Sequence, residues 1–145
     1  QLAKIIPVVK VQDFVTKFQL YTVPGQVYYN STRKMVLKGV DGLVFVADSQ
    51  YDKMEENAES FQNLEENLAE YGYSLDEIPC VLQFNKRDIE PAAPTHYLDY
   101  LLNRQKQRMH AFEASATKGH GVYETLNQVA RLVLHKMQHD MKVKG

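Results

Sequence analysis

Residues 80–88 read CVLQFNKRD, in which a mainly apolar run is followed at once by four polar residues. A continuous apolar run, without alternation of polar and apolar residues, is typical of a strand in a parallel sheet that is covered on both faces. Ligands of such sheets bind at the carboxyl ends of the strands. The stretch therefore predicts a buried strand that leads directly into a binding loop at 85–88.

The rest of the chain alternates predicted strands with predicted helices. A second buried strand is LVFVA at 43–47, and further strands are predicted at 5–11, 17–21 and 111–113. Apolar residues at helical spacing predict helices at 51–72 and 122–137, and weaker patterns predict helices at 26–37 and 94–107. This alternation indicates an α/β fold with a mostly parallel sheet. No linker interrupts it, so we expect residues 1–145 to form a single domain.

The composition excludes several classes of protein. The 145 residues carry 17 basic and 18 acidic side chains, a net charge of −1, with no block of Lys or Arg, whereas nucleic-acid binding usually leaves a basic footprint. Cys80 is the single cysteine, so no intrachain disulfide can form and we expect a reducing, cytoplasmic location. No apolar stretch is long enough to span a bilayer. We therefore predict a cytoplasmic domain with no nucleic-acid partner and no transmembrane segment.

The loop Asn85–Asp88 resembles the N-K-x-D motif of Ras-like GTPases. A carboxylate at Asp88 can accept hydrogen bonds from N1–H and the 2-amino group of guanine, whereas adenine lacks that amino group and carries an acceptor at N1. The aliphatic stem of Lys86 can lie along the base, and Asn85 can tie the loop together. Taken alone, an ordinary polar loop after a strand explains these four residues equally well.

Two further motifs follow predicted strands in the order that Ras-like proteins show. Ser115-Ala116 follows the strand at 111–113; the Ala116 N–H would donate to guanine O6, and Thr117 completes this predicted nucleotide-binding loop. The run TVPGQ, from Thr22 to Gln26, follows the strand at 17–21. Each motif by itself is also consistent with a common Ser/Thr-rich or Pro-Gly turn.

Residues 21–29, YTVPGQVYY, and 37–49, LKGVDGLVFVADS, are very similar to the MglA family of bacterial gliding-motility and cell-polarity GTPases. The resemblance implies a three-layer Ras-like P-loop NTPase fold and a switch that binds GTP, GDP and Mg²⁺ and hydrolyses GTP. It also implies that Gln26 is the catalytic residue that places the attacking water. A GTPase-activating partner of the MglB type, with a roadblock fold, is implied as well.

The same resemblance assigns the switch II turn to Thr22, Val23, Pro24 and Gly25, with the Gly25 N–H sensing the γ-phosphate. Most Ras-like proteins have Asp in place of Thr22, where it helps to hold Mg²⁺, but the MglA family usually has Thr. The metal ligands of this chain are therefore left unassigned.

The 145 residues contain no G-x-x-x-x-G-K-[ST] motif, the loop that holds the phosphates and supplies a hydroxyl to Mg²⁺. We expect that loop, the first strand and the first helix of the fold to precede Gln1, and this chain alone to be inactive. In the Ras-like sheet the absent strand separates the strands at 17–21 and 43–47. We expect those two strands to be left apart, to be bridged by another strand, or to pair directly with a distorted site.

The alternative function is a degenerate, non-hydrolysing domain that acts as a protein-interaction module. The absence of the phosphate-loop motif favours it. The guanine-reading residues favour a GTPase, because an interaction module has no need of them.

Overall fold

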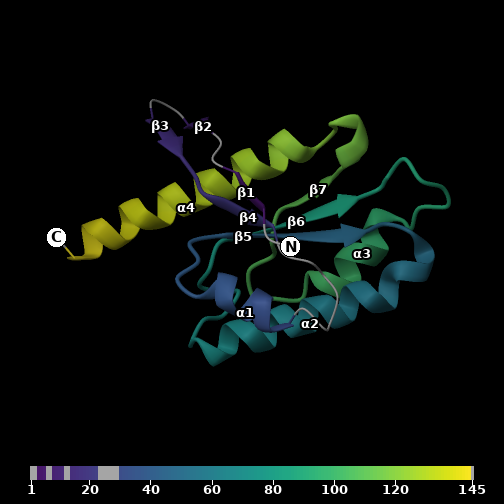
Figure 1. Ribbon diagram of the computed structural model, residues 1–145, viewed down its shortest axis with the longest axis horizontal. Helices are drawn as coiled ribbons and strands as arrows, with labels where there is room; N and C mark the ends of the chain where they lie inside the picture. Colours follow the sequence, from purple (N-terminus) through teal and green to yellow (C-terminus); the bar gives the residue numbers. More distant parts are fainter. Residues whose placement is uncertain (1–2, 6–7, 12–13, 23–29, 145) are drawn as a thin grey trace.

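The computed structural model describes residues 3–5, 8–11, 14–22 and 30–144 (Figure 1). Its central sheet has three parallel strands in the order β5-β6-β7, with bounds of Leu43–Asp48, Cys80–Asn85 and Ala111–Glu113. The register places Asp48, the last residue of β5, beside Asn85, the last residue of β6. The carboxyl ends of these two strands are therefore level with each other.

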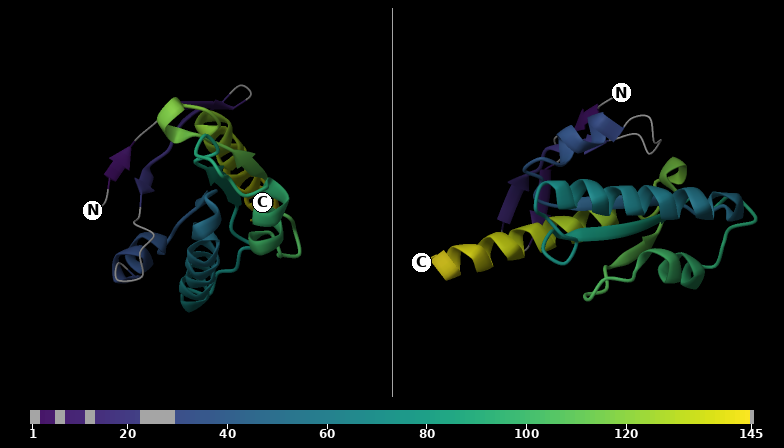
Figure 2. Two further views of the ribbon diagram at one scale, coloured as in Figure 1. Left: turned by 90° about the vertical axis from the view of Figure 1, so that its right-hand side faces the viewer. Right: turned by 90° about the horizontal axis from the view of Figure 1, so that it is seen from below.

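Helices cover both faces of the central sheet and give the molecule three layers (Figure 2). On one face lies α4, Val122–Lys144. On the other face lie α2, Met54–Glu70, and α3, Thr95–Leu102, with α1, Asn30–Leu37, beside α2. Short 3-10 turns, η2 at Tyr51–Lys53 and η3 at Ala116–Lys118, lead out of β5 and β7. The predicted α/β architecture with a parallel sheet is confirmed.

One predicted helix ends earlier than expected, and another is described only in part. The helix predicted at 94–107 ends at Leu102, because the Asn103 side chain binds the backbone of Met109 through both of its polar atoms, each at 2.8 Å. These bonds draw residues 103–109 into a return loop and prevent the helix from continuing. The helix predicted at 26–37 is described from Asn30 onward, and its earlier residues lie outside the described part of the chain.

The hydrophobic core is centred on β6. Leu82 is fully buried and belongs to one apolar cluster with Phe61 of α2 and Leu98 of α3. The sequence predicts equal burial for β5, and this is wrong. Phe45 packs edge-on against Phe61, with ring centroids 5.0 Å apart, so the neighbouring Val46 points to the opposite face of the sheet. There Val46 stays 52% exposed, and no described strand pairs with the outer edge of β5.

The amino-terminal part of the chain forms antiparallel ladders separate from the central sheet. Strands β1, Ala3–Ile5, and β4, Leu20–Thr22, make one ladder; β2, Val8–Val11, and β3, Phe14–Lys17, make the other. The ladders continue a single register, so they are two parts of one hairpin. The prediction of a single strand at 17–21 is wrong, because Lys17 ends β3 and Leu20 begins β4. In the strand predicted at 5–11, Ile5 and Val8–Val11 are strand residues, and residues 6–7 lie outside the described part of the chain.

This hairpin lies beside α4 (Figure 1), and Phe18 and Leu134 each pack against Ala130 of that helix. Strand β4 and strand β5 belong to different sheets. Among the described residues, the two strands are thus left apart, which is the first of the three arrangements expected from the sequence.

Candidate functional site

Polar residues gather at the carboxyl ends of the three parallel strands. Asp48 ends β5, Asn85 ends β6 and leads into Asp88, and Ser115 follows β7. Because the strands run in the same direction, their following loops meet at one edge of the sheet. The loops that follow β5, β6 and β7 therefore lie together at this edge.

Two hydrogen bonds join the loop after β6 to the loop after β7. The Ala116 backbone N–H donates to Asn85 Oδ1 at 2.9 Å, and the Ser115 hydroxyl donates to Asp88 Oδ1 at 2.8 Å. The structure therefore brings together four of the predicted base-reading residues. The Ala116 N–H, which the sequence assigns to guanine O6, is engaged here by Asn85. Thr117 lies exposed in the η3 turn that follows.

The Asp88 side chain is exposed, and its surroundings favour the ionised carboxylate. The hydrogen bond from Ser115 is the main cause that lowers the pKa of Asp88 below its usual value, and the positive charges of Lys118 and His120 act in the same direction. An ionised carboxylate accepts hydrogen bonds only. Asp88 therefore presents acceptors, and no donor, at neutral pH.

Lys86 adopts a left-handed backbone conformation with φ of +62°, which is uncommon for a residue with a side chain. Its ammonium lies 2.9 Å from Asp48 Oδ2, so the side chain reaches from the end of β6 to the end of β5. In the sequence, Asp48 follows the predicted strand at 43–47. No motif marks it as the partner of Lys86, because the two residues are far apart in the chain.

Arg87, the variable position of the motif, ties the loop to its surroundings. Its backbone N–H donates to Ala114 O at 3.1 Å, its Nε lies 3.2 Å from Glu113 Oε1, and its Nη1 donates to Ala93 O. One residue thus connects the loop after β6 with two other segments. Sequence reasoning missed Arg87, because a surface arginine in a loop carries no signal of its partners.

A compact turn connects β7 to α4 and shapes the second loop. Ser115 and His120 exchange two backbone hydrogen bonds of 3.0 Å, and Gly121 follows with φ of +77°. At the start of α4, the Thr125 hydroxyl donates to Gly121 O at 2.6 Å and accepts from Gln83 Nε2 at 2.9 Å. Gln83 and Thr125 are both buried. This chain of bonds anchors the Ser115 loop to the central strand.

The remaining predicted site residues are placed only in part. Thr22 is the exposed last residue of β4. Val23, Pro24, Gly25 and Gln26 lie outside the described residues, so their switch and catalytic roles stay predictions. Within residues 3–5, 8–11, 14–22 and 30–144, no three His, Cys, Asp or Glu side chains are grouped to hold a metal ion. No helix in the described part of the chain is long and apolar enough to cross a membrane.

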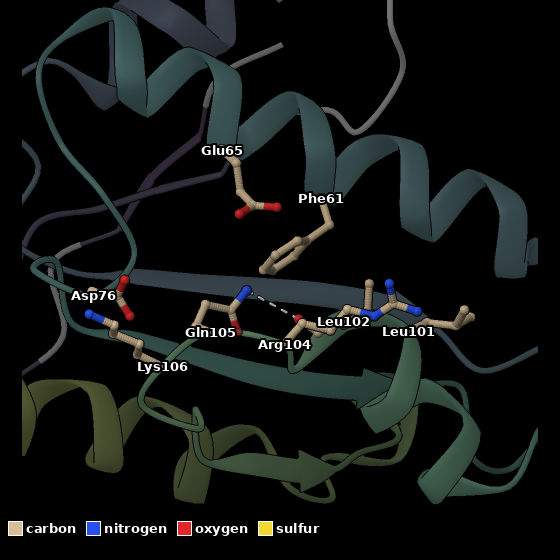
Figure 3. Close-up of a pocket in the computed structure, with 8 residues that line it drawn as sticks. All are labelled: Phe61, Glu65, Asp76, Leu101, Leu102, Arg104, Gln105 and Lys106. Atoms are coloured by element: carbon tan, nitrogen blue, oxygen red, sulfur yellow. Dashed lines mark hydrogen bonds between the residues drawn. The ribbon is translucent and has the colours of Figure 1, made fainter.

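A pocket of about 280 Å³ lies between α2 and the segments that lead into β6 and β7 (Figure 3). Phe61 and Glu65 of α2 line it together with Asp76 and Gln105. Burial raises the pKa of Glu65, and Gln105 Nε2 donates to Leu102 O at 3.3 Å. The pocket is built from segments that precede the strands, so it is distinct from the loops at their carboxyl ends.

A three-layer α/β domain with these loops belongs to the class of Ras-like small GTPases, and comparison with known proteins identifies the family. Residues 5–133 match the ADP-ribosylation factor family, and the chain belongs to it. The chain is also 50% identical, over 129 residues, to mutual gliding-motility protein MglA of Myxococcus xanthus (strain DK1622). That alignment covers 89% of this chain and 65% of the relative. The predicted resemblance to MglA-type small GTPases is confirmed, and the chain spans about two thirds of that relative's length.

Proposed function

We propose that this chain is the base-reading and switch part of a GTPase that alternates between GTP-bound and GDP-bound states and hydrolyses GTP. The observation that carries the proposal is the pair of bonds from Ala116 to Asn85 and from Ser115 to Asp88. They hold two loops in one arrangement beside an exposed, ionised carboxylate, and a site preorganised in this way loses less entropy on binding.

Each residue has a proposed role toward guanine. Asp88 accepts from N1–H and the 2-amino group, and the stem of Lys86 lies along the base plane. Ala116 redirects its N–H from Asn85 Oδ1 to O6 when the base binds, and the bond from the Ser115 hydroxyl to Asp88 keeps the two loops joined. Thr117 borders the same loop. Mg²⁺ is the proposed metal, with ligands that remain unassigned.

A competition experiment on the full-length protein tests this function. GDP should displace a fluorescent guanine nucleotide at concentrations about ten- to a hundredfold lower than ADP, because an unmatched base leaves polar groups unpaired. Equal displacement by ADP, or no binding of either nucleotide, would contradict the proposal. Absence of binding would instead support the second candidate, a protein-interaction module, which is favoured by the lack of a G-x-x-x-x-G-K-[ST] motif in the 145 residues.

Replacing Gln26 with Leu is expected to slow hydrolysis while GTP remains bound. Leucine is close to glutamine in size but cannot hydrogen-bond the attacking water, and loss of a water-orienting residue removes transition-state stabilisation. Phosphate release in a single turnover of the full-length protein measures the effect. Gln19→Leu, on the exposed residue before β4, is the control. A normal rate in the Gln26 variant, with and without an activating protein, would remove this residue from the mechanism.

The cellular process is proposed from the relative. Half of the aligned residues are identical to those of mutual gliding-motility protein MglA, whose name describes gliding motility. We infer that this protein acts in bacterial polarity or motility, in the cytoplasm, with an activating partner of the MglB type. Retention of the partner on the GTP-loaded protein, and not on the GDP-loaded protein, would be the expected result of a pull-down.

A further inference from the structure

The ion pair between Lys86 and Asp48 connects the proposed base site to a strand that carries none of its predicted base contacts. The two charged atoms lie 2.9 Å apart, and the side chains are 46% and 20% exposed. Lys86 thereby extends from the end of β6 across to the end of β5. Lys86 thus reaches towards β5, whereas Ser115 and Ala116 follow β7, the strand on the other side of β6.

Asp48 is held more firmly than an ordinary surface ion pair requires. Its Oδ1 accepts from the Gln50 backbone N–H at 3.0 Å and from Gln50 Nε2 at 3.1 Å. Its backbone is clamped by the buried Asn57 of α2, which accepts from Asp48 N at 3.1 Å and donates to Asp48 O at 2.8 Å. The carboxylate therefore has a fixed position to which Lys86 can be drawn.

The charge of Asp48 is maintained at that position. Partial burial acts to raise its pKa, but hydrogen bonds from Gln50 and Lys86 outweigh this and leave the pKa below its usual value. The ion pair is therefore present throughout the neutral pH range. Holding a lysine side chain in one conformation carries a large cost in side-chain entropy. Here the ion pair with Asp48 orders the Lys86 side chain before any ligand binds.

We propose that Asp48 is a positioning residue for the nucleotide base, which acts by fixing the Lys86 stem as the wall of the site that faces β5. The inference rests on the proposed function. Asp48 itself does not touch the base. Its contribution is to keep Lys86 extended, so that the base enters between this stem and the Ala116 loop without ordering a flexible side chain.

A double-mutant cycle in the full-length protein tests the inference. The variants are Asp48→Asn, Lys86→Met and the two combined. Asp48→Asn retains an acceptor for Gln50, and it leaves the Asn57 bonds intact because they go to the backbone. Lys86→Met keeps an apolar stem. GDP affinity is measured by titration, and urea unfolding of each variant reports stability. Asp52→Asn, on the exposed η2 turn, is the matched control.

We expect Asp48→Asn to weaken GDP binding about three- to tenfold, within the range found for coupled neighbours, and to have almost no further effect once Lys86 is Met. Equal weakening in both backgrounds would show that Asp48 acts through the fold, and unchanged affinity in the single variant would show that the ion pair does not position Lys86. Either result overturns the inference while leaving GDP binding by the unmodified protein intact. Failure of the unmodified protein to bind GDP would overturn the proposed function, and this inference with it.

Discussion

Replacing Gly121 with Ala is expected to lower the free energy of unfolding by about 3 kcal/mol or more, the combined scale of backbone strain and overpacking. Gly121 has φ of +77°, and a Cβ atom there would lie 2.1 Å from Glu113 O and 2.9 Å from Ala114 Cα. These two are backbone atoms of the segment that leads to Ser115, and Ala114 Cβ would lie at 2.9 Å as well. Neither backbone atom can move without disturbing the turn that connects β7 to α4.

Gly119 provides a matched control two residues earlier in the same turn. It also has a positive φ, +75°, but a Cβ atom there would meet nothing within 4 Å. Gly119→Ala should therefore cost only the left-handed strain, about 1–2 kcal/mol. Urea unfolding of the full-length protein and both variants measures the difference. Equal destabilisation would show that the turn relaxes around the new methyl group and that the close approach to Glu113 has little weight.

Replacing Asp88 with Asn is expected to change which base the full-length protein prefers. The Asn amide would present a donor to the guanine 2-amino group, which also donates, whereas xanthine has a carbonyl at that position. An unpaired polar group costs about 1–3 kcal/mol, which corresponds to roughly ten- to a hundredfold in affinity. Competition binding with GDP and XDP should therefore show weaker GDP binding and stronger XDP binding.

The variant keeps an oxygen that can accept the Ser115 hydroxyl, so the two loops should stay joined. Asp140→Asn, at the exposed end of α4, is the control and should bind GDP as the unmodified protein does. Unchanged preference for GDP in the Asp88 variant would show that this carboxylate does not contact the base. Because the pKa of Asp88 lies below its usual value, GDP binding should be constant through neutral pH and weaken only in acid, as Asp88 becomes protonated.

Patterns in the sequence predict the three strands of the central sheet and the start of its binding loops. The apolar runs at 43–47 and 80–84 predict parallel strands, and the structure has β5 and β6 there. Asn85, Asp88, Ser115 and Ala116 were predictable because each lies at the end of a strand or in the loop after it, and the loops after parallel strands meet at one edge. Patterns of this kind depend only on residues that are neighbours in the sequence.

Contacts between residues distant in the chain are visible only in the folded structure. The pairing of Lys86 with Asp48, the anchoring of Arg87 to Ala93 and Glu113, and the bond from Gln83 to Thr125 have no local pattern. The early end of α3 depends on bonds from Asn103 to Met109, and the exposure of Val46 depends on what covers β5. Side-chain partners are set by how the layers meet, and the pattern within one element does not identify them. The apolar pattern predicted the burial of β6 but not the exposure of Val46, which depends on what covers β5.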